Sequence, residues 1–183
     1  KIKSNFFWVD ERCVDPSSND SNFGSAKKHF FSKVNISNNN IFRIRGEEKP
    51  EIEASYYTEL LKTKTEIIKN IPSLDLCLLG IGGDGHTASI FPHELKKLSD
   101  RSDCVVGINP DSGQKRVSLS IKQINNSKEV IFHVCGSGKK DVVDMIISKR
   151  DNYLDLPASH ILPKSKNLSW YLDFDSAETF MGT

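Results

Sequence analysis

The stretch LDLCLLGIGGDGHTASIFP, residues 74–92, decides the fold that we expect for this chain. It begins as a nearly unbroken apolar run, which is typical of a strand buried on both faces of a parallel sheet. A turn with Gly80, Gly82 and Gly85 follows, in the G-x-G-x-x-G pattern of dinucleotide-binding loops. Such a loop opens a full helix, whereas here Pro92 stands only seven residues after Gly85. No Gly-Lys-Ser/Thr sequence follows either, so neither a nicotinamide site nor a Walker-type phosphate loop is indicated.

The turn still has the features of a ligand site. Open α/β sheets bind ligands at the carboxyl ends of their strands, and this turn places Asp84 and His86 there. Imidazole titrates near neutral pH and can act as a general base, while glycines let the backbone approach an oxyanion or a phosphate closely. The alternative is a tight turn in which the ring of His86 caps a carbonyl group. The motif alone leaves both interpretations open.

Apolar patterns on both sides of this stretch alternate between strand and helix. The expected strands are residues 5–9, 41–44, 74–80, 104–108, 116–121, 129–136 and a segment from 168, and the expected helices are residues 23–34, a long segment from 50, 139–149 and a short segment near the C-terminus. This alternation predicts a single α/β domain over residues 1–183. Its sheet should be open, mostly parallel and Rossmann-like, with helices on both faces.

Three details of the pattern are specific. Ser21 or Asn22 is expected to cap the first helix. The long helical segment begins at Pro50, and its core-facing stripe is expected to be Ile52, Tyr56, Leu60, Ile67, Ile68 and Ile71. Residues 116–121 alternate between apolar and polar as in a half-exposed strand, with the apolar positions at Val117, Leu119 and Ile121.

The composition excludes several kinds of protein. Hydrophobic residues make up 37% of the chain, charged residues 27%, and the formal net charge is +1, so neither disorder nor a nucleic-acid partner is indicated. No apolar run approaches the roughly 20 residues of a membrane-spanning helix. The cysteines are too widely spaced for a zinc site, and those at positions 77, 104 and 135 are expected to be buried free thiols. We therefore expect a cytoplasmic protein without a metal.

Several segments together resemble one family. GIGGDGHTASIFP is similar to the glycine-rich segment of the 6-phosphogluconolactonases, and WVDERCVDPSSNDSN resembles their Asp-Glu-Arg segment with its later Ser-Asn. KRVSLSIKQINNSKEVIFHVCGSGKKDVV resembles their Arg-apolar-Thr-Leu strand and Gly-x-x-Lys turn, and LPASHI their Leu-Pro-Ala segment. The related glucosamine-6-phosphate deaminases carry Asp-Glu-Tyr and Gly-His-Ile-Ala-Phe-Asn-Glu-Pro at the two main positions. The resemblance therefore favours the hydrolase.

The sequence departs from the family's pattern at its N-terminus. The family has an N-terminal strand and a Gly-Gly-Ser-Thr-Pro-like loop that helps to hold the substrate phosphate, and no stretch of this sequence corresponds to them. We expect such a segment to precede Lys1. The alternative is a phosphate pocket that is built differently.

The resemblance implies hydrolysis of 6-phospho-D-glucono-1,5-lactone to 6-phosphogluconate in the oxidative pentose phosphate pathway, by a monomer that needs no cofactor. His86 would activate the water as general base, and Asp84 and Asp10 would orient His86 or the sugar hydroxyls. The implied substrate and phosphate contacts are Arg12, Asn22, Gly82, Gly83, Arg116 and Lys139.

Each of these roles has a simpler alternative. Asp84 would equally serve as a turn cap, Asn22 as a helix cap, Arg12 as a solvated loop arginine and Lys139 as a charge at a helix start. For the whole chain, the alternatives are a deaminase-like enzyme and a non-catalytic sugar-phosphate-binding protein.

Overall fold

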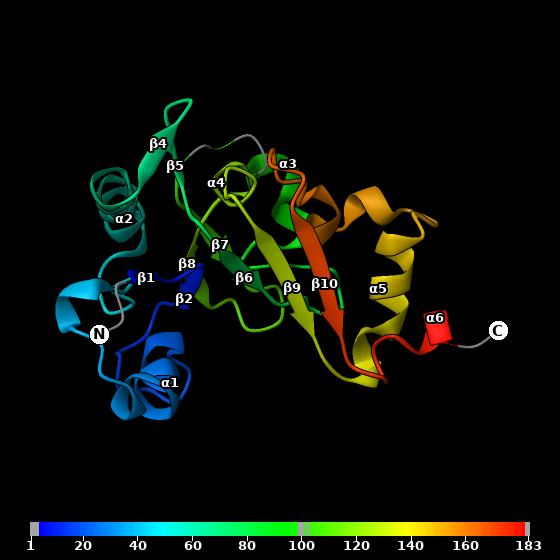
Figure 1. Cartoon of the computed structure of the whole chain (residues 1–183), viewed down its shortest axis with the longest axis horizontal. Helices are drawn as coiled ribbons and strands as arrows, with labels where there is room; N and C mark the ends of the chain where they lie inside the picture. Colours follow the sequence, from blue (N-terminus) through cyan, green and yellow to red (C-terminus); the bar gives the residue numbers. More distant parts are fainter. Residues whose placement is uncertain (1–3, 99–100, 102, 182–183) are drawn as a thin grey trace.

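Strands and short helices alternate along the chain, which confirms the α/β class (Figure 1). The structure is a computed structural model and describes residues 4–98, 101 and 103–181. The strands are β1 (Phe6–Phe7), β2 (Asp10–Arg12), β3 (Ile41–Phe42), β4 (Glu66–Ile68), β5 (Ile71–Ser73), β6 (Cys77–Leu79), β7 (Val105–Ile108), β8 (Lys115–Ser118), β9 (Val130–Val134) and β10 (Leu168–Leu172). The α-helices are α1 (Asn22–His29), α2 (Pro50–Lys64), α3 (Leu95–Leu98), α4 (Ile121–Ile124), α5 (Lys140–Ile147) and α6 (Glu178–Met181). Short 3-10 helices include η3 (Pro92–Glu94), η4 (Ser137–Lys139) and η6 (Pro157–His160).

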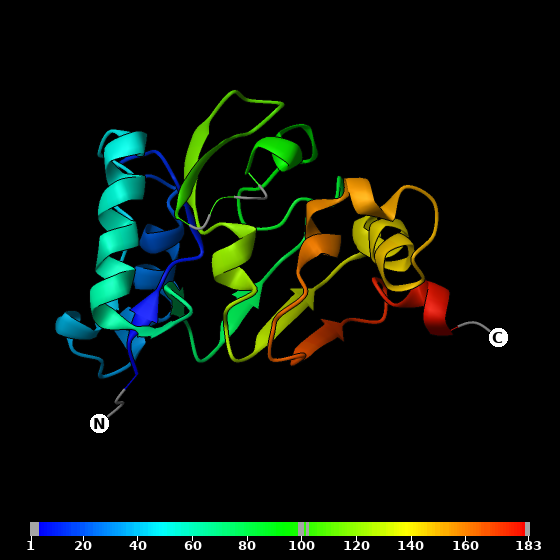
Figure 2. The same ribbon diagram turned by 90° about the horizontal axis from the view of Figure 1, so that it is seen from above.

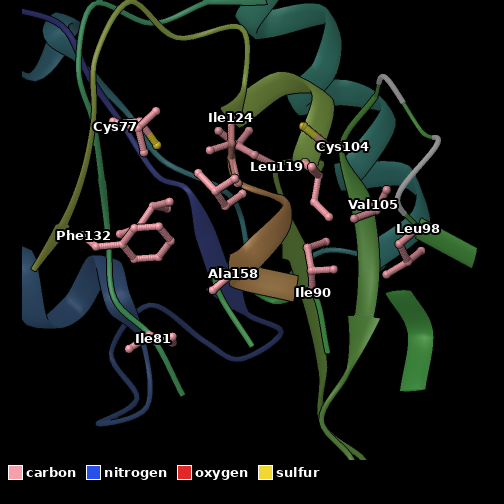
Figure 3. Packing of buried hydrophobic residues seen from close by; sticks show 14 of the residues in the cluster. Cys77, Ile81, Ile90, Leu98, Cys104, Val105, Leu119, Ile124, Phe132 and Ala158 are labelled. Atoms are coloured by element: carbon pink, nitrogen blue, oxygen red, sulfur yellow. The ribbon is translucent and has the colours of Figure 1, made fainter. Parts of the chain in front are cut away.

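A parallel sheet of three strands, in the order β10-β9-β6, forms the centre of the molecule. Its inner face carries Leu79 from β6 and Phe132 from β9, and the ring of Phe132 stacks on Trp170 of β10 at 4.1 Å between ring centroids. Apolar residues of α4 and α5 pack in the same core. Figure 3 shows part of this core, including Phe132 of β9 and Ile124 of α4. Figure 2 shows these helices on one side of the parallel strands.

The opposite face of this sheet is open in the described part of the chain. Leu78 in β6 is 59% exposed, and Tyr171 in β10 is 58% exposed. The prediction that residues 74–80 form a strand buried on both faces is therefore wrong. Side chains alternate across a strand, and the described helices cover only the side toward which Cys77 and Leu79 point.

A second, antiparallel sheet in the order β2-β8-β7 was not part of the sequence-based expectation. The half-exposed strand expected over residues 116–121 is wrong in two respects. Val117 and Leu119 are buried as expected, but the polar positions Ser118 and Ser120 are fully buried as well, and the strand ends at Ser118. Ser120 then caps α4 in a reciprocal capping box with Gln123, so Ile121 begins a helix instead of continuing the strand.

The helix from Pro50 is shorter than its apolar pattern predicts. It ends at Lys64, because Lys69 and Asn70 take positive φ values that close a hairpin between β4 and β5. The predicted stripe is also wrong, since Ile52 and Tyr56 are exposed. The buried face of α2 lies about a third of a turn away and consists of Glu53, Ala54, Tyr57, Thr58 and Leu61.

Tyr57 ties α2 to the first strands. Its hydroxyl oxygen accepts a hydrogen bond from the backbone N–H of Trp8 at 2.8 Å, and its O–H group lies 3.0 Å from the carbonyl oxygen of Phe42. Tyr57 is fully buried, and burial raises its pKa well above the ordinary value. Tyr57 therefore holds the segment just before β2, which carries Asp10 and Arg12, against α2.

The cysteines are free thiols where the structure describes them. Cys77 and Cys104 are buried as expected, and burial raises their pKa values to about 12 and about 11. Cys135 is exposed, contrary to the expectation, because β9 ends at Val134 and the chain turns outward there. Among the described residues, no helix combines the length and the apolar character needed to cross a membrane.

Candidate active site

The glycine turn after β6 is closed by its own hydrogen bonds. The N–H of Gly82 donates to the carbonyl oxygen of His86 at 2.8 Å, and the N–H of Gly85 donates to the carbonyl oxygen of Gly82 at 3.0 Å. Gly85 has φ +81°, and a Cβ there would lie 2.8 Å from the side chain of Leu156. The resemblance implied a substrate contact at Gly82. Its N–H is already bonded to the carbonyl oxygen of His86 and is therefore not free to donate to a substrate.

Asp84 holds the imidazole of His86. Its Oδ1 lies 2.6 Å from Nδ1 of the ring and also accepts the backbone N–H of His86 at 3.1 Å. A carboxylate only accepts hydrogen bonds, so Nδ1 carries the proton and the lone pair of the neutral ring is on Nε2. Burial raises the pKa of Asp84, but the hydrogen bonds from His86 outweigh it, and the net pKa is below the ordinary value.

The surroundings of this pair fix the ring further. The imidazole of His86 lies against Phe91, with 4.7 Å between ring centroids, and Phe91 is fully buried. On the other side, a Cβ added to Gly82 would lie 2.1 Å from Nδ1 of His86 and 2.5 Å from Oδ1 of Asp84. The absence of a side chain at Gly82 therefore leaves the space in which the Asp84–His86 pair lies.

Asp10, at the start of β2, has other partners. Its Oδ2 accepts the hydroxyl of Ser89 at 2.6 Å, and its carbonyl oxygen and Oδ1 lie 3.0 and 3.3 Å from Nδ2 of Asn22. The sequence analysis left open whether Asp10 or Asp84 orients His86, and the distances assign that contact to Asp84. The Ser89–Asp10 bond also joins the glycine-turn segment to β2 across 79 positions of sequence.

Two arginines lie side by side at the same place. Arg12 of β2 is directly opposite Arg116 of β8, and like charges in such a pair destabilise a sheet. The Nε atoms of both are buried and make no hydrogen bond in the described part of the chain. Burial and the charge of Arg12 lower the pKa of Arg116. Two adjacent guanidinium groups whose buried Nε donors are unused form a site suited to an anion.

These groups meet at one cavity of about 250 Å³ between β2, β6 and β8. Six of the nine site residues expected from sequence line it: Asp10, Arg12, Asn22, Gly82, His86 and Arg116. Its remaining wall includes β6 and the turn after it. Half of the twelve residues that line the cavity were therefore expected from sequence, although they come from four separate segments.

The three other expected residues lie around this cavity. Asp84 contacts Nδ1 of the His86 ring and does not itself line the cavity. Gly83 and Lys139 are close to each other, since a Cβ added to Gly83 would lie 4.0 Å from the Lys139 amine. Lys139 belongs to η4, which follows a turn at Gly136 with φ +95°. Neither Gly83 nor Lys139 lines the cavity itself.

Sequence reasoning missed two contacts that shape the site. No role for Ser89 was predicted from sequence, whereas its hydroxyl donates to Oδ2 of Asp10. Phe91 was read as part of a motif, whereas its buried ring underlies both His86 and Arg116, whose guanidinium carbon lies 5.6 Å from the ring centroid. Local sequence carries no signal for either contact, because each depends on how distant segments pack. Within the described ranges, no group of three or more potential metal ligands is clustered.

Several known proteins are similar to this chain in sequence or in fold. The chain is 39% identical to a 6-phosphogluconolactonase of Treponema pallidum over 87% of its own length and 66% of the relative's. It is 38% identical to a 6-phosphogluconolactonase of Haemophilus influenzae over 92% of its own length and 70% of the relative's. The solved structure of the 6-phosphogluconolactonase from Trypanosoma brucei superposes with a TM-score of 0.83 at 29% identity, covering 96% of this chain and 73% of that one.

A family model described as glucosamine-6-phosphate isomerases/6-phosphogluconolactonase matches residues 2–170. The chain spans about two thirds of the length of the first of these relatives. With the match over nearly the whole chain and the site geometry described above, the chain belongs to the glucosamine-6-phosphate isomerase/6-phosphogluconolactonase family.

Proposed function

We propose that this chain is a 6-phosphogluconolactonase in which His86 is the general base for hydrolysis of 6-phospho-D-glucono-1,5-lactone. The lactonase activity is that of the relatives at 38–39% identity. The observation that supports the mechanism is the contact of 2.6 Å between Asp84 and Nδ1 of His86, which leaves Nε2 of the ring as a base at the cavity. An ester hydrolase of this kind needs no covalent intermediate.

The reaction follows from this geometry. Nε2 of His86 takes a proton from water as the water oxygen attacks the lactone carbonyl carbon, and Asp84 stabilises the imidazolium that forms. The bond from the carbonyl carbon to the ring oxygen then breaks, and the imidazolium returns the proton to that oxygen. The product is a ring-opened acid, which ionises and releases one proton to solution. General base catalysis of this kind contributes roughly 10²–10⁴-fold in rate.

The remaining groups hold the substrate. Arg12 and Arg116 supply paired cationic donors for the phosphate, and Lys139 adds a further charge beside the glycine turn. Asp10 and Asn22 face the same cavity and bind sugar hydroxyls. Gly83 lies beside Lys139, and we assign its backbone N–H to the substrate phosphate as well.

The test is proton release from freshly generated lactone, followed with a pH indicator against the spontaneous background. We expect His86→Ala to lower kcat about 10²–10⁴-fold, which a general base supplies. His133→Ala is the matched control, because His133 is an exposed residue of β9 that does not line the cavity, and its loss should leave kcat unchanged. Turnover that survives His86→Ala in a folded protein would rule out this mechanism.

Two further readouts separate the alternatives. A deaminase-like enzyme would release ammonia from glucosamine 6-phosphate, which a direct ammonia assay detects. A non-catalytic binding protein would bind 6-phosphogluconate without accelerating lactone hydrolysis. We also propose that the chain acts as a monomer in the cytoplasm. Gel filtration with light scattering tests the oligomeric state.

A further inference from the structure

We propose that Glu11 is a positioning residue that sets Arg12 and Asn22 for substrate binding, although its own side chain faces away from the cavity. The proposal rests on the lactonase function above and deepens it. Glu11 is the central residue of the Asp-Glu-Arg segment, and it does not line the cavity that its two neighbours reach. Because side chains alternate along β2, Asp10 and Arg12 point to one side and Glu11 to the other.

The carboxylate of Glu11 is buried and fully used as an acceptor. Only 1% of the residue is exposed. Oε1 accepts the N–H of Arg12 at 2.8 Å and the N–H of Asn22 at 2.7 Å. Oε2 accepts the N–H of Phe23 at 2.7 Å and the hydroxyl of Ser21 at 3.0 Å. In the described part of the chain this carboxylate forms no ion pair with a basic side chain.

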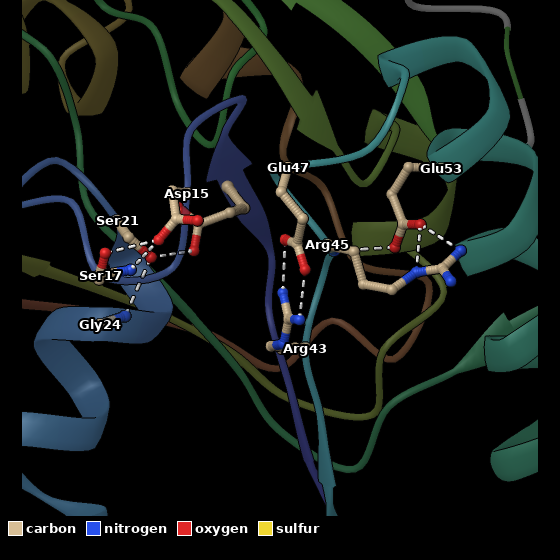
Figure 4. Close-up of polar contacts among 9 residues, drawn as sticks. Asp15, Ser17, Ser21, Gly24, Arg43, Arg45, Glu47 and Glu53 are labelled. Carbon is tan, nitrogen blue, oxygen red and sulfur yellow. Dashed lines mark hydrogen bonds and ion pairs between the residues drawn. The ribbon is translucent and has the colours of Figure 1, made fainter.

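These four donors belong to the two ends of one loop. Arg12 opens the loop after β2, and Ser21 and Asn22 close it at the start of α1. Ser21 is the helix cap, as expected from sequence, and its oxygen also accepts the N–H of Gly24 at 3.0 Å (Figure 4). The N-terminus of α1 carries partial positive charge, which compensates the buried carboxylate in place of a cationic side chain. Glu11 thus joins the two ends of this loop through hydrogen bonds on the side of β2 that faces away from the cavity.

The closed loop fixes both substrate-binding groups. One guanidinium nitrogen of Arg12 donates to the carbonyl oxygen of Asp20, which lies on the loop just before Ser21. The backbone of Asn22 is held by Glu11, while its side-chain amide reaches Asp10. Movement of the loop would therefore displace the guanidinium and the amide together. Among the described residues, no hydrogen bond joins His86 or Asp84 to this loop, so the chemistry should be separable from binding.

The experiment is steady-state kinetics of Glu11→Gln, with the affinity for 6-phosphogluconate measured by calorimetry. Glutamine keeps the shape but replaces one acceptor oxygen by an NH₂ group, which faces donors it cannot bond. We expect KM and the product Kd to rise together by about 10-fold or more, with kcat within about 3-fold of wild type, since a displacement of ~1 Å costs up to 10²-fold in function. Retained kcat shows that the His86 mechanism is intact, so failure of the proposed function is distinguishable from failure of this inference.

Glu53→Gln is the matched control. Glu53 is also a fully buried carboxylate, and it binds the backbone N–H and the guanidinium of Arg45, outside the cavity (Figure 4). It should lower the melting temperature without raising KM. If Glu53→Gln raises KM as much at an equal loss of stability, or if Glu11→Gln leaves KM unchanged or lowers kcat alone, Glu11 has no positioning role.

A second variant covers the case in which Glu11→Gln does not fold. Ser21→Ala removes one of the four donors to Glu11 and leaves the carboxylate in place. We expect a smaller rise in KM and in product Kd, in the same direction and with kcat unchanged. An unchanged KM in folded Ser21→Ala, together with an unfolded Glu11→Gln, would overturn the inference and leave Glu11 a structural residue only.

Discussion

Gly82→Ala is the substitution for which the structure gives the sharpest expectation. The added Cβ would lie 2.1 Å from Nδ1 of His86, whereas ordinary contacts begin near 3.4 Å. The ring must therefore retreat by about 1.3 Å, and Oδ1 of Asp84, at 2.5 Å, must also move. Both groups are ends of side chains that can rotate away, so the fold should survive while the Asp84–His86 contact is lost.

The size of the effect follows from the role assigned to His86. Loss of a positioned general base costs roughly 10²–10⁴-fold in rate, which corresponds to about 2.7–5.4 kcal/mol in activation free energy. We expect kcat to fall within that range, while the melting temperature changes little. The assay is proton release from fresh lactone with the spontaneous rate subtracted, alongside a thermal unfolding curve.

A neighbouring glycine supplies the control. A Cβ on Gly80 would meet nothing within 4 Å. Gly80→Ala should keep kcat within a few-fold of wild type. The reasoning is refuted if folded Gly82→Ala retains wild-type kcat, or if Gly80→Ala loses activity to the same extent.

Two other predictions concern Asp84 and Tyr57. In Asp84→Asn the amide can donate to Nδ1 and move the proton of His86 to Nε2, so kcat should fall at least ~10²-fold. The pKa of Asp84 is lowered in the folded state, so its contribution to stability is present above about pH 4 and is lost as the pH falls through that lowered value. Wild type and Asp84→Asn should therefore differ in urea denaturation at pH 7 and converge in strong acid. Tyr57→Phe leaves the N–H of Trp8 without its partner and should cost about 1–3 kcal/mol in unfolding free energy, with kcat unchanged; an equal stability for both proteins would contradict the role given to that hydroxyl.

The parts of this protein that sequence predicted well are those governed by local chemistry. Ser21 as a cap, Pro50 as a helix start and the glycine turn with Asp84 and His86 all follow from preferences within a few residues. The resemblance to a family then brought Arg12 and Arg116 into the same site, although 104 positions separate them.

The errors arose where the environment of a segment decides its structure. An unbroken apolar run at residues 74–80 indicates a strand buried on both sides only if both sides are covered, and Leu78 is exposed. The apolar stripe from Ile52 to Ile71 combined a helix and a hairpin, because periodicity does not register the positive φ values at Lys69 and Asn70. The Ser89–Asp10 contact, likewise, exists only once two distant segments have packed.

The opposed arginines of β2 and β8 have a thermodynamic consequence. Arg12 and Arg116 repel each other in the free protein, and an anion bound between them removes that repulsion. Whatever binds the folded chain and not the unfolded chain shifts the folding equilibrium by mass action, and a ligand at a hundred times its Kd adds about 2.7 kcal/mol. With the phosphate-binding role proposed for the two arginines, the folded population of the protein is therefore coupled to the supply of phosphorylated substrate and product.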